Sequence, residues 1–466
     1  MLMVGSVLAG LSTGNLYFDD ITFITISSLF LFAGLFLAGC ISNKLYFTFL
    51  VFQIIAFPSA IDNLIPGVYQ GDMNELNASI FPMFTHTDIY LLLGILKGIQ
   101  AGNRAVLPSS RFLFLSVVVL FLSSTINIFY SRNPQDFLLL TAGFIHLRYL
   151  IWFFLLFSLY SPAPYSRAII NGLILSVIFL FIEAMVFTKI NGLERLTSGT
   201  LGNNSYGNVV SCITVYLILL YKTNAYGNKT LLVITILIGF TTVILTETRM
   251  ALFGGLVLYF VGIYYHNRKS FLRLLYVFLV SAGLVFSVLL MPTYRDNIPK
   301  RFDLVDLVSK IHFNMPWHGE SVLEIESTKE TWSFLTRFKL YETSVNMISK
   351  NPFFGIGSMR WDYYKNEYGF DERVLIDSHN GYLAILSQFG LISIVFIFFI
   401  YFLSVRFLKE KHERTDTNPY TYLGLISLGM AISDLSNAGI YKHEIYGLLC
   451  LVIMILLSNK ARMQGI

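Results

Sequence analysis

The stretch LIDSHNGYLAILSQFGLIS, residues 375–393, changes from polar to apolar halfway along its length. Asp377, Ser378, His379 and Asn380 all form hydrogen bonds readily, and an apolar run follows them at once. Such runs dominate the chain, because 55% of its residues are hydrophobic and 13% are charged, roughly half the charged share of an average soluble domain. The sequence therefore predicts a membrane protein in which residues 375–393 lead from a polar loop into a span.

Apolar segments long enough to cross a bilayer as helices recur along the sequence, since a span needs about 20 such residues. We expect an all-α polytopic membrane protein with about 12 to 14 transmembrane helices. The predicted spans lie near residues 21–41, 44–60, 87–101, 111–130, 137–160, 167–189, 204–221, 230–246, 250–266, 271–291, 379–405, 419–435 and 444–458, with a weaker candidate at 1–18.

Basic residues indicate which way these spans run, because Lys and Arg gather in cytoplasmic loops. If the spans alternate, one side receives Arg104, Arg111, Arg167, Lys222, Lys229, Arg268, Lys269, Arg273, Arg406, Lys409, Lys411, Arg414, Lys460 and Arg462. The opposite, outer side receives the turn TETR (246–249) and the long loop 292–378. We therefore divide the chain into a first part of the helix bundle (1–291), an outer loop (292–378) and a second part of the bundle (379–466).

The outer loop is predicted to be structured, because loops of this length usually carry function. Leu335, Phe338, Val345 and Ile348 recur at helical spacing within residues 333–350. The turn residues of NPFFGIG (351–357) then end the pattern. We expect an amphipathic helix on the outer membrane surface and a turn that leads back towards His379.

Three residues of the outer side are candidates for chemistry: Arg249 in TETR, Arg337 on the loop helix, and His379 at the start of a span. Each also has a structural interpretation. Arg249 is able to anchor a helix at the membrane interface, Arg337 to be one solvated charge among many, and His379 to stand beside a helix cap formed by Asp377 or Ser378.

The order of these motifs resembles the superfamily of bacterial O-antigen ligases and O-antigen polymerases. The shared pattern is TETR, then R-x-x-x-Y-E-x-x-x-N-x-x-x-x-x-P-F-x-G-x-G from Arg337, then HN at 379–380 before a span closed by Gly390. TLGNNSYGNVV (200–210) is similar to a glycine- and asparagine-containing stretch of that family. The resemblance covers residues 200 to 400 and implies a GT-C-like membrane fold.

The resemblance implies transfer of a glycan from undecaprenyl diphosphate to a sugar hydroxyl at the outer face of the inner membrane, without metal or cofactor. Arginine binds phosphate oxygens bidentately, so Arg249 and Arg337 are expected to stabilise the leaving diphosphate. An imidazole that titrates near neutral pH suits a general base, and His379 is that candidate.

Further substrate-binding residues are expected around these three. They are Asn380, which follows the histidine; Tyr341, which belongs to the loop-helix motif; Arg360, beside the aromatic Trp361 and Tyr364; and Arg148, an ionisable residue within a span that is also able to pair with Glu183. The expected partners are the lipid-linked oligosaccharide, an acceptor glycan and the lipid bilayer, with a chain-length regulator left open and no nucleic acid.

Several functions remain open at this point. A polymerase joins repeat units, whereas a ligase moves the finished polymer to the lipid A core; Ser393, three residues after Gly390, mildly favours the polymerase. A transporter of lipid-linked sugars is less favoured, because transporters place substrate sites at the bilayer midplane within repeated halves, and this sequence shows no repeat. A non-catalytic membrane scaffold is the remaining alternative.

Overall fold

The computed structural model describes residues 42–56, 86–103, 117–118, 121–122, 145–193, 195–198, 201–267, 271–272, 275–276, 311–313, 323–325, 329–357, 361–370, 378–395, 398, 402, 405, 419–435 and 443–463. Its bundle helices are α3 (Asn43–Ala56), α4 (His86–Gln100), α7 (Ile145–Leu159), α8 (Ser166–Ile190), α9 (Gly202–Lys222), α10 (Lys229–Leu245), α11 (Arg249–His266), α19 (Gly424–Ser433) and α20 (His443–Met463). The predicted spans at 21–41, 111–130 and 271–291 lie wholly or largely outside the described residues.

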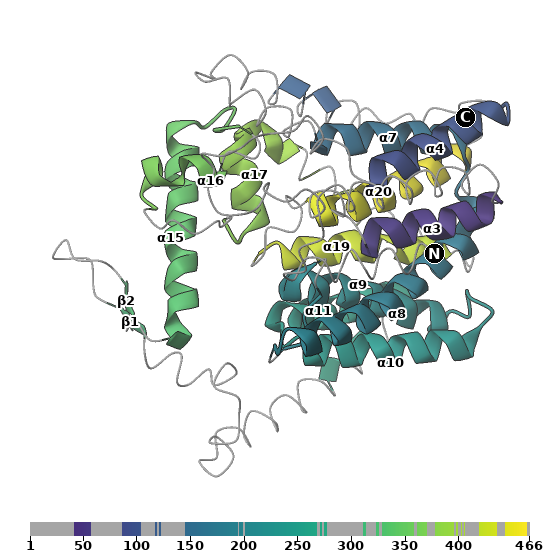
Figure 1. The fold of residues 1–466 in the computed structure, drawn as a ribbon, viewed down its shortest axis with the longest axis horizontal. Coiled ribbons are helices and arrows are strands. Elements are labelled where there is room, and N and C mark those ends of the chain that lie inside the picture. The colour runs from purple at the N-terminus through teal and green to yellow at the C-terminus, as the bar shows by residue number, and fades with distance from the viewer. Residues whose placement is uncertain are drawn as a thin grey trace, which may run out of the picture.

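The bundle helices lie side by side, as Figure 1 shows, and share one large apolar core. α15 (Lys329–Lys350) stands at one end of the bundle and runs across the direction of its helices, with α16 (Trp361–Tyr364) and α17 (Gly381–Phe389) beside it (Figure 1). α17 connects the two parts, because it contacts both α15 and the end of α19.

α10 has the outward face of a helix in lipid. Leu237, Phe240 and Ile244 are 60%, 51% and 63% exposed, whereas the small or hydroxyl-bearing Gly239 and Thr242 face inward towards α9. Membrane helices pack through such small and polar residues, because lipid removes the drive to bury large apolar ones. By length and composition, one helical stretch among the described residues, Ala163–Ile190, is long and apolar enough to cross a membrane; α3, α7, α10, α11 and most of the others are shorter and apolar.

Contacts near the ends of the helices show which helix ends lie together. The Tyr226 hydroxyl donates to Asn171 Oδ1 at 2.6 Å, which places the connection from Lys222 to Lys229 beside the second turn of α8, four residues after Arg167. Gly254 and Gly262 of α11 face Ile432 and Leu425 of α19, so these two helices are antiparallel. The start of α11 therefore lies with the end of α19, at the bundle end opposite to Lys222.

The outer loop contains a small core of its own, formed by Leu340, Met347, Ile356, Trp361 and Phe370. Part of this loop is thus structured, as predicted, but the helix begins at Lys329 rather than near residue 333. Phe338 and Val345 of the predicted apolar stripe are exposed, whereas Leu340, Thr343, Ser344 and Met347 on a different face are buried within the loop. The position of this helix on a membrane surface stays a prediction. The buried hydroxyls permit close packing, and Ser344 Oγ accepts a 3.0 Å hydrogen bond from Trp361 Nε1.

The helical fold also includes a short antiparallel strand pair that was not predicted, β1 (Ile311–Phe313) paired with β2 (Leu323–Ile325), whose apolar residues alternate with His312 and Glu324. One further expectation is corrected. The span predicted at 379–405 is not one continuous helix. α17 ends at Phe389, Gly390 has a φ of 75°, and a 3₁₀ turn, Leu391–Ser393, follows.

Two glycines allow the backbone of the NPFFGIG turn to pack closely against the end of α17. Backbone hydrogen bonds join Ile356 N to Ser387 O at 2.9 Å and Leu391 N to Pro352 O at 2.7 Å. A Cβ atom on Gly355 would lie 2.4 Å from the backbone of Gln388. A Cβ atom on Gly390 would lie 2.2 Å from the Phe353 carbonyl oxygen, so this contact tolerates only glycine at both positions.

We predict that Gly355→Ala loosens this contact and destabilises the protein more than Gly369→Ala. Both residues have positive φ values, 68° and 102°, which cost an L-residue about 1–2 kcal/mol. Only Gly355 adds a backbone clash, since nothing lies within 4 Å of a Cβ on Gly369, and such overpacking costs about 1–3 kcal/mol more. Thermal unfolding of the two purified variants measures the difference, and equal losses would contradict a tight contact.

Candidate functional site

His379 lies where α17 meets the end of α19. Three hydrogen bonds form this junction: Gly381 N to Asp434 O at 2.9 Å, Asn380 Nδ2 to Leu435 O at 3.1 Å, and Tyr382 Oη to Ala431 O at 2.9 Å. Gly381 permits the approach, because a Cβ there would lie 2.7 Å from Asp434 Cγ. The histidine is therefore held at the bundle end by the residues that follow it.

The backbone of His379 is in the left-handed region, with a φ of 48°. Glu247, in the turn before Arg249, has a φ of 50°. Such conformations cost about 1–3 kcal/mol for residues other than glycine and concentrate at functional sites. Two of the three predicted catalytic segments thus carry strained backbone.

Asn380, rather than Asp377 or Ser378, caps the helix that follows. Its Oδ1 accepts from Leu383 N at 3.0 Å, while its Nδ2 donates to Leu435 O. Both polar atoms of the amide are engaged within the protein, so its structural role is clear. Its predicted contact with substrate stays a prediction.

Arg249 is the first residue of α11, directly after the turn at Thr246–Thr248. This confirms the predicted turn at TETR. Gly207 of α9 makes room for the turn, because a Cβ there would lie 2.8 Å from Thr246 Oγ1. The side chain of Thr248 does not cap α11, so the positive end of the helix dipole is not offset by a side-chain oxygen at that position.

The antiparallel packing of α11 and α19 brings Arg249 and His379 to the same bundle end. Gly254 lies opposite Ile432, so Arg249 is five residues beyond that level, or about 7 Å along the helix axis. Asp434 is two residues beyond the same level in the other helix, and it touches the start of α17. The junction of α11, α17 and α19 is therefore the candidate site.

Arg337 lies on α15 and shares one face of that helix with Phe338 and Tyr341. The rings of Phe338 and Tyr341 are 6.3 Å apart. Burial raises the pKa of the Tyr341 hydroxyl, and the positive charge of Arg337 partly opposes this rise. The two predicted residues are thus neighbours, whereas a meeting of Arg337 with His379 stays a prediction.

Arg148 has a partner that the sequence did not indicate. Its Nε lies 2.8 Å from Asp88 Oδ1, which joins α7 to α4, and its guanidinium lies 5.7 Å from the ring centre of Tyr149. Arg148 thus pairs with a carboxylate that is 1% exposed, and its pairing with Glu183 stays a prediction. Arg360 lies outside the described residues.

Asp434 is the main residue of the site that sequence reasoning missed. It is fully buried at the C-terminal end of α19, and it lies close enough to Cys212 of α9 to interact electrostatically. The signal for it was an acidic residue at the end of an apolar span, since ionisable groups at such positions are costly and commonly functional. The described residues contain no cluster of three or more potential metal ligands.

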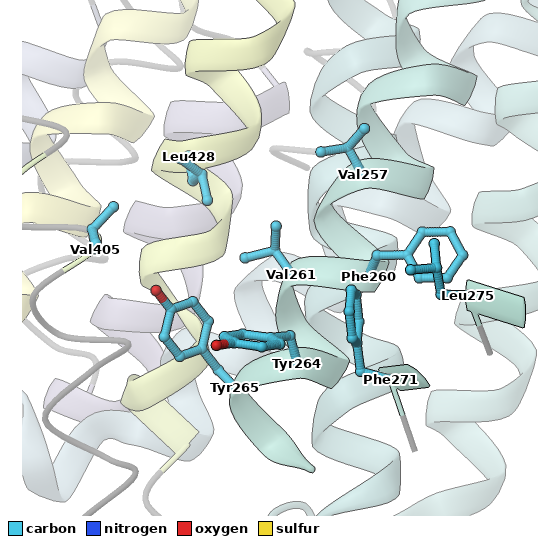
Figure 2. Close-up of a pocket in the computed structure, with 9 residues that line it drawn as sticks. All are labelled: Val257, Phe260, Val261, Tyr264, Tyr265, Phe271, Leu275, Val405 and Leu428. Carbon is cyan, nitrogen blue, oxygen red and sulfur yellow. The ribbon is translucent and has the colours of Figure 1, made fainter. Parts of the chain in front are cut away.

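A cavity of about 470 Å³ lies elsewhere, along the second half of α11 (Figure 2). Its lining is aliphatic and aromatic, and Tyr264 and Tyr265 lie at one side of it. The lining residues are Val257, Phe260, Val261, Tyr264, Tyr265, Phe271, Leu275, Val405 and Leu428. None of the predicted catalytic residues lines this cavity.

Comparison with known families gives a match over part of the chain. Residues 234–399 match the family model described as O-Antigen ligase. This stretch contains Arg249, Arg337, His379 and the glycine contact of α17, and it confirms the resemblance to the O-antigen ligase and polymerase superfamily. Comparison with curated proteins found no match.

We predict that Asn380→Ala lowers stability by about 2 kcal/mol, because it removes both a helix cap and the hydrogen bond to Leu435, each worth about 1 kcal/mol. Asn228→Ala is a matched control, since Asn228 caps α10 through Leu231 N and lies at the opposite bundle end. Chemical unfolding of both variants tests this. A loss for Asn380→Ala no larger than that for Asn228→Ala would contradict the second contact.

We also predict that Arg148→Met is more destabilising than the double change Arg148→Met with Asp88→Asn. The single change leaves the Asp88 charge buried without this counter-ion, which costs about 3–5 kcal/mol. The double change removes that charge. Unfolding midpoints decide the point, and equal losses in both variants would show that the ion pair is not important for stability.

Proposed function

We propose that this chain is a glycosyltransferase that polymerises O-antigen or capsule repeat units carried on undecaprenyl diphosphate. The observation that carries the proposal is the junction of α11, α17 and α19. Arg249 at the start of α11 and His379 before α17 lie at this junction, and both belong to the stretch that matches the O-antigen ligase family. The buried carboxylate of Asp434 at the end of α19, which packs against that stretch, also lies there. A basic group for a phosphate and an imidazole for a hydroxyl are the two functions that this transfer requires.

The proposed location is the bacterial inner membrane, with many spans and the site facing the periplasm. The apolar outward face of α10 supports contact with lipid. The bundle end with Arg167, Lys222 and Lys229 is then cytoplasmic by the positive-inside rule, and the His379 end is periplasmic. Residues 292–378 form the periplasmic catalytic loop in this arrangement.

In the proposed reaction, His379 accepts the proton of an acceptor sugar hydroxyl as its oxygen attacks the anomeric carbon of the donor glycan. The bond from that carbon to the phosphate oxygen breaks, and undecaprenyl diphosphate leaves with the electron pair. Arg249 and Arg337 stabilise the negative charge of the diphosphate through charge-assisted hydrogen bonds. The first turn of α11 adds the positive end of its helix dipole. The proposal includes no metal and no cofactor.

Backbone strain at His379 fits this role. The left-handed conformation of His379 and the capping of α17 by Asn380 fix the backbone position from which the imidazole extends. This position does not depend on whether a sugar is bound. A base must lie within hydrogen-bond reach of the proton that it removes, so a fixed attachment point raises the productive fraction of encounters.

A ligase that transfers the finished polymer to the lipid A core is the second candidate, favoured by the description of the matching family. Ser393, the residue that mildly favours the polymerase, donates from its Oγ to the Gly390 carbonyl oxygen at 2.6 Å and is buried in the turn after α17. Its hydroxyl closes that turn.

We expect purified protein in lipid to convert undecaprenyl-diphosphate repeat units into a ladder of longer glycans. His379→Ala should reduce transfer about 100-fold or more, since general base catalysis contributes roughly 10²–10⁴. His266→Ala is the matched control, because His266 bonds to Tyr422 at the opposite bundle end and should retain activity. Transfer only after addition of lipid A core would establish the ligase, and neither product from native substrates would overturn both candidates.

A further inference from the structure

Asn208, in the second turn of α9, is a buried amide that the fold does not use. Its side chain is 3% exposed, and among the residues that the structure describes neither Oδ1 nor Nδ2 has a hydrogen-bond partner. Buried amides nearly always find partners, because an amide removed from water without them pays its full desolvation penalty. An apolar residue of the same size would avoid that penalty, so the amide requires an explanation other than packing.

The contacts of its neighbours place Asn208 on the face of α9 that lies between α11 and α19. Ser211 Oγ donates to Ala251 O of α11 at 2.7 Å, and Cys212 Sγ packs against Gly429 of α19. At about 100° per residue, position 208 falls between these two directions on the helix surface. Asn208 is therefore directed towards the gap between α11 and α19, not towards α8 or α10.

Asn208 lies at the same level along the bundle axis as the candidate site. Gly207 lies against the Thr246–Thr248 turn, so the next residue of α9 is level with Arg249. Cys212 of α9 lies against Gly429 of α19, and the two helices are antiparallel. One turn from Cys212 towards the start of α9 reaches Asn208, and one turn from Gly429 towards the end of α19 approaches Asp434, so both turns reach the same level of the bundle. Asn208 thus lies beneath the junction at which α11 begins and α19 ends.

We propose that Asn208 is a binding residue for the head group of the donor, at the bond between the sugar and the diphosphate. The inference rests on the proposed function and adds a residue to it. Nδ2 donates to an oxygen of the head group, and Oδ1 accepts from a sugar hydroxyl. The position beside the start of α11 favours the donor over the acceptor, because the negative charge of the diphosphate is drawn to that helix end.

The test compares Asn208→Leu with Thr214→Val in purified full-length protein, using the undecaprenyl-diphosphate repeat unit as the varied substrate. Thr214 is a matched control on the same helix, since its buried hydroxyl already donates to Val210 O and faces Gly239 of α10. We expect Asn208→Leu to raise the KM for the donor about 10-fold or more, as expected for lost hydrogen bonds to a charged group. Thr214→Val should leave KM unchanged.

Thermal unfolding without substrate separates binding from structure. A binding role predicts that Asn208→Leu unfolds at the same temperature as the wild type or higher, because it removes an unsatisfied buried amide. An unchanged KM in Asn208→Leu would overturn the inference, whatever the unfolding temperature of the variant. A wild-type protein without transfer activity would overturn the proposed function first and this inference with it.

The substitution Asn208→Asp identifies the bound atom. A carboxylate repels phosphate but still accepts from a hydroxyl. A KM increase larger than that of Asn208→Leu would therefore assign Asn208 to a phosphate oxygen. A smaller increase would assign it to a sugar hydroxyl, and both results support the binding role. A KM equal to that of the wild type in the Asn208→Asp variant would contradict it.

Discussion

The hydrogen bonds between α17 and the end of α19 are the constraint on which the site depends. They use the backbone of Gly381 and the side chains of Asn380 and Tyr382, and all of them follow His379 within three residues. Because α19 also packs against α9 and α11, the same junction fixes the histidine relative to Arg249. Loss of the junction would separate the two chemical groups although both helices remained folded.

Close helix approach is the second condition, and small residues provide it. Gly207, Gly255 and Gly429 lie where α9, α11 and α19 meet, and a Cβ at any of them would come within 3 Å of a neighbouring atom. In a bundle whose outward faces are apolar, such packing replaces the hydrophobic drive of a soluble core. Two of the polar residues on these helices, Asn208 and Asp434, are buried within this close packing.

Much of this arrangement was predictable from sequence, because long apolar runs and basic loops act over whole helices. The bundle helices, the turn at 246–249 and the structured loop followed from those patterns. The physical reason for the break at Gly390 did not. The family pattern places Gly390 at the close of a span, but only the contact with Phe353 shows why the helix must stop there. The face of α15 that packs within the loop was not evident from sequence, because Thr343 and Ser344 are polar by composition yet buried by packing.

The residues of the candidate site also divide into those that sequence motifs identified and those that only the packing of the helices brought to the site. His379, Arg249 and Arg337 stand in recognisable motifs, so residue type and order were enough to select them. Asp434 stands outside the quoted motifs, and Asn208 lies in TLGNNSYGNVV without any feature that singles it out there. Each lies near the end of an apolar helix, and only the antiparallel register of α19 with α9 and α11 brings them to one level. Likewise, the partner of Arg148 is distant in sequence, and spacing along one helix could not identify Asp88.

The glycine contact between the NPFFGIG turn and α17 has a mechanical consequence. Backbone touches backbone there, so α15 cannot slide along α17 without breaking hydrogen bonds on both sides of the contact. The end of the helix that carries Arg337 and the helix that follows His379 are thus joined through backbone atoms. A side-chain substitution elsewhere on either helix would leave these hydrogen bonds in place.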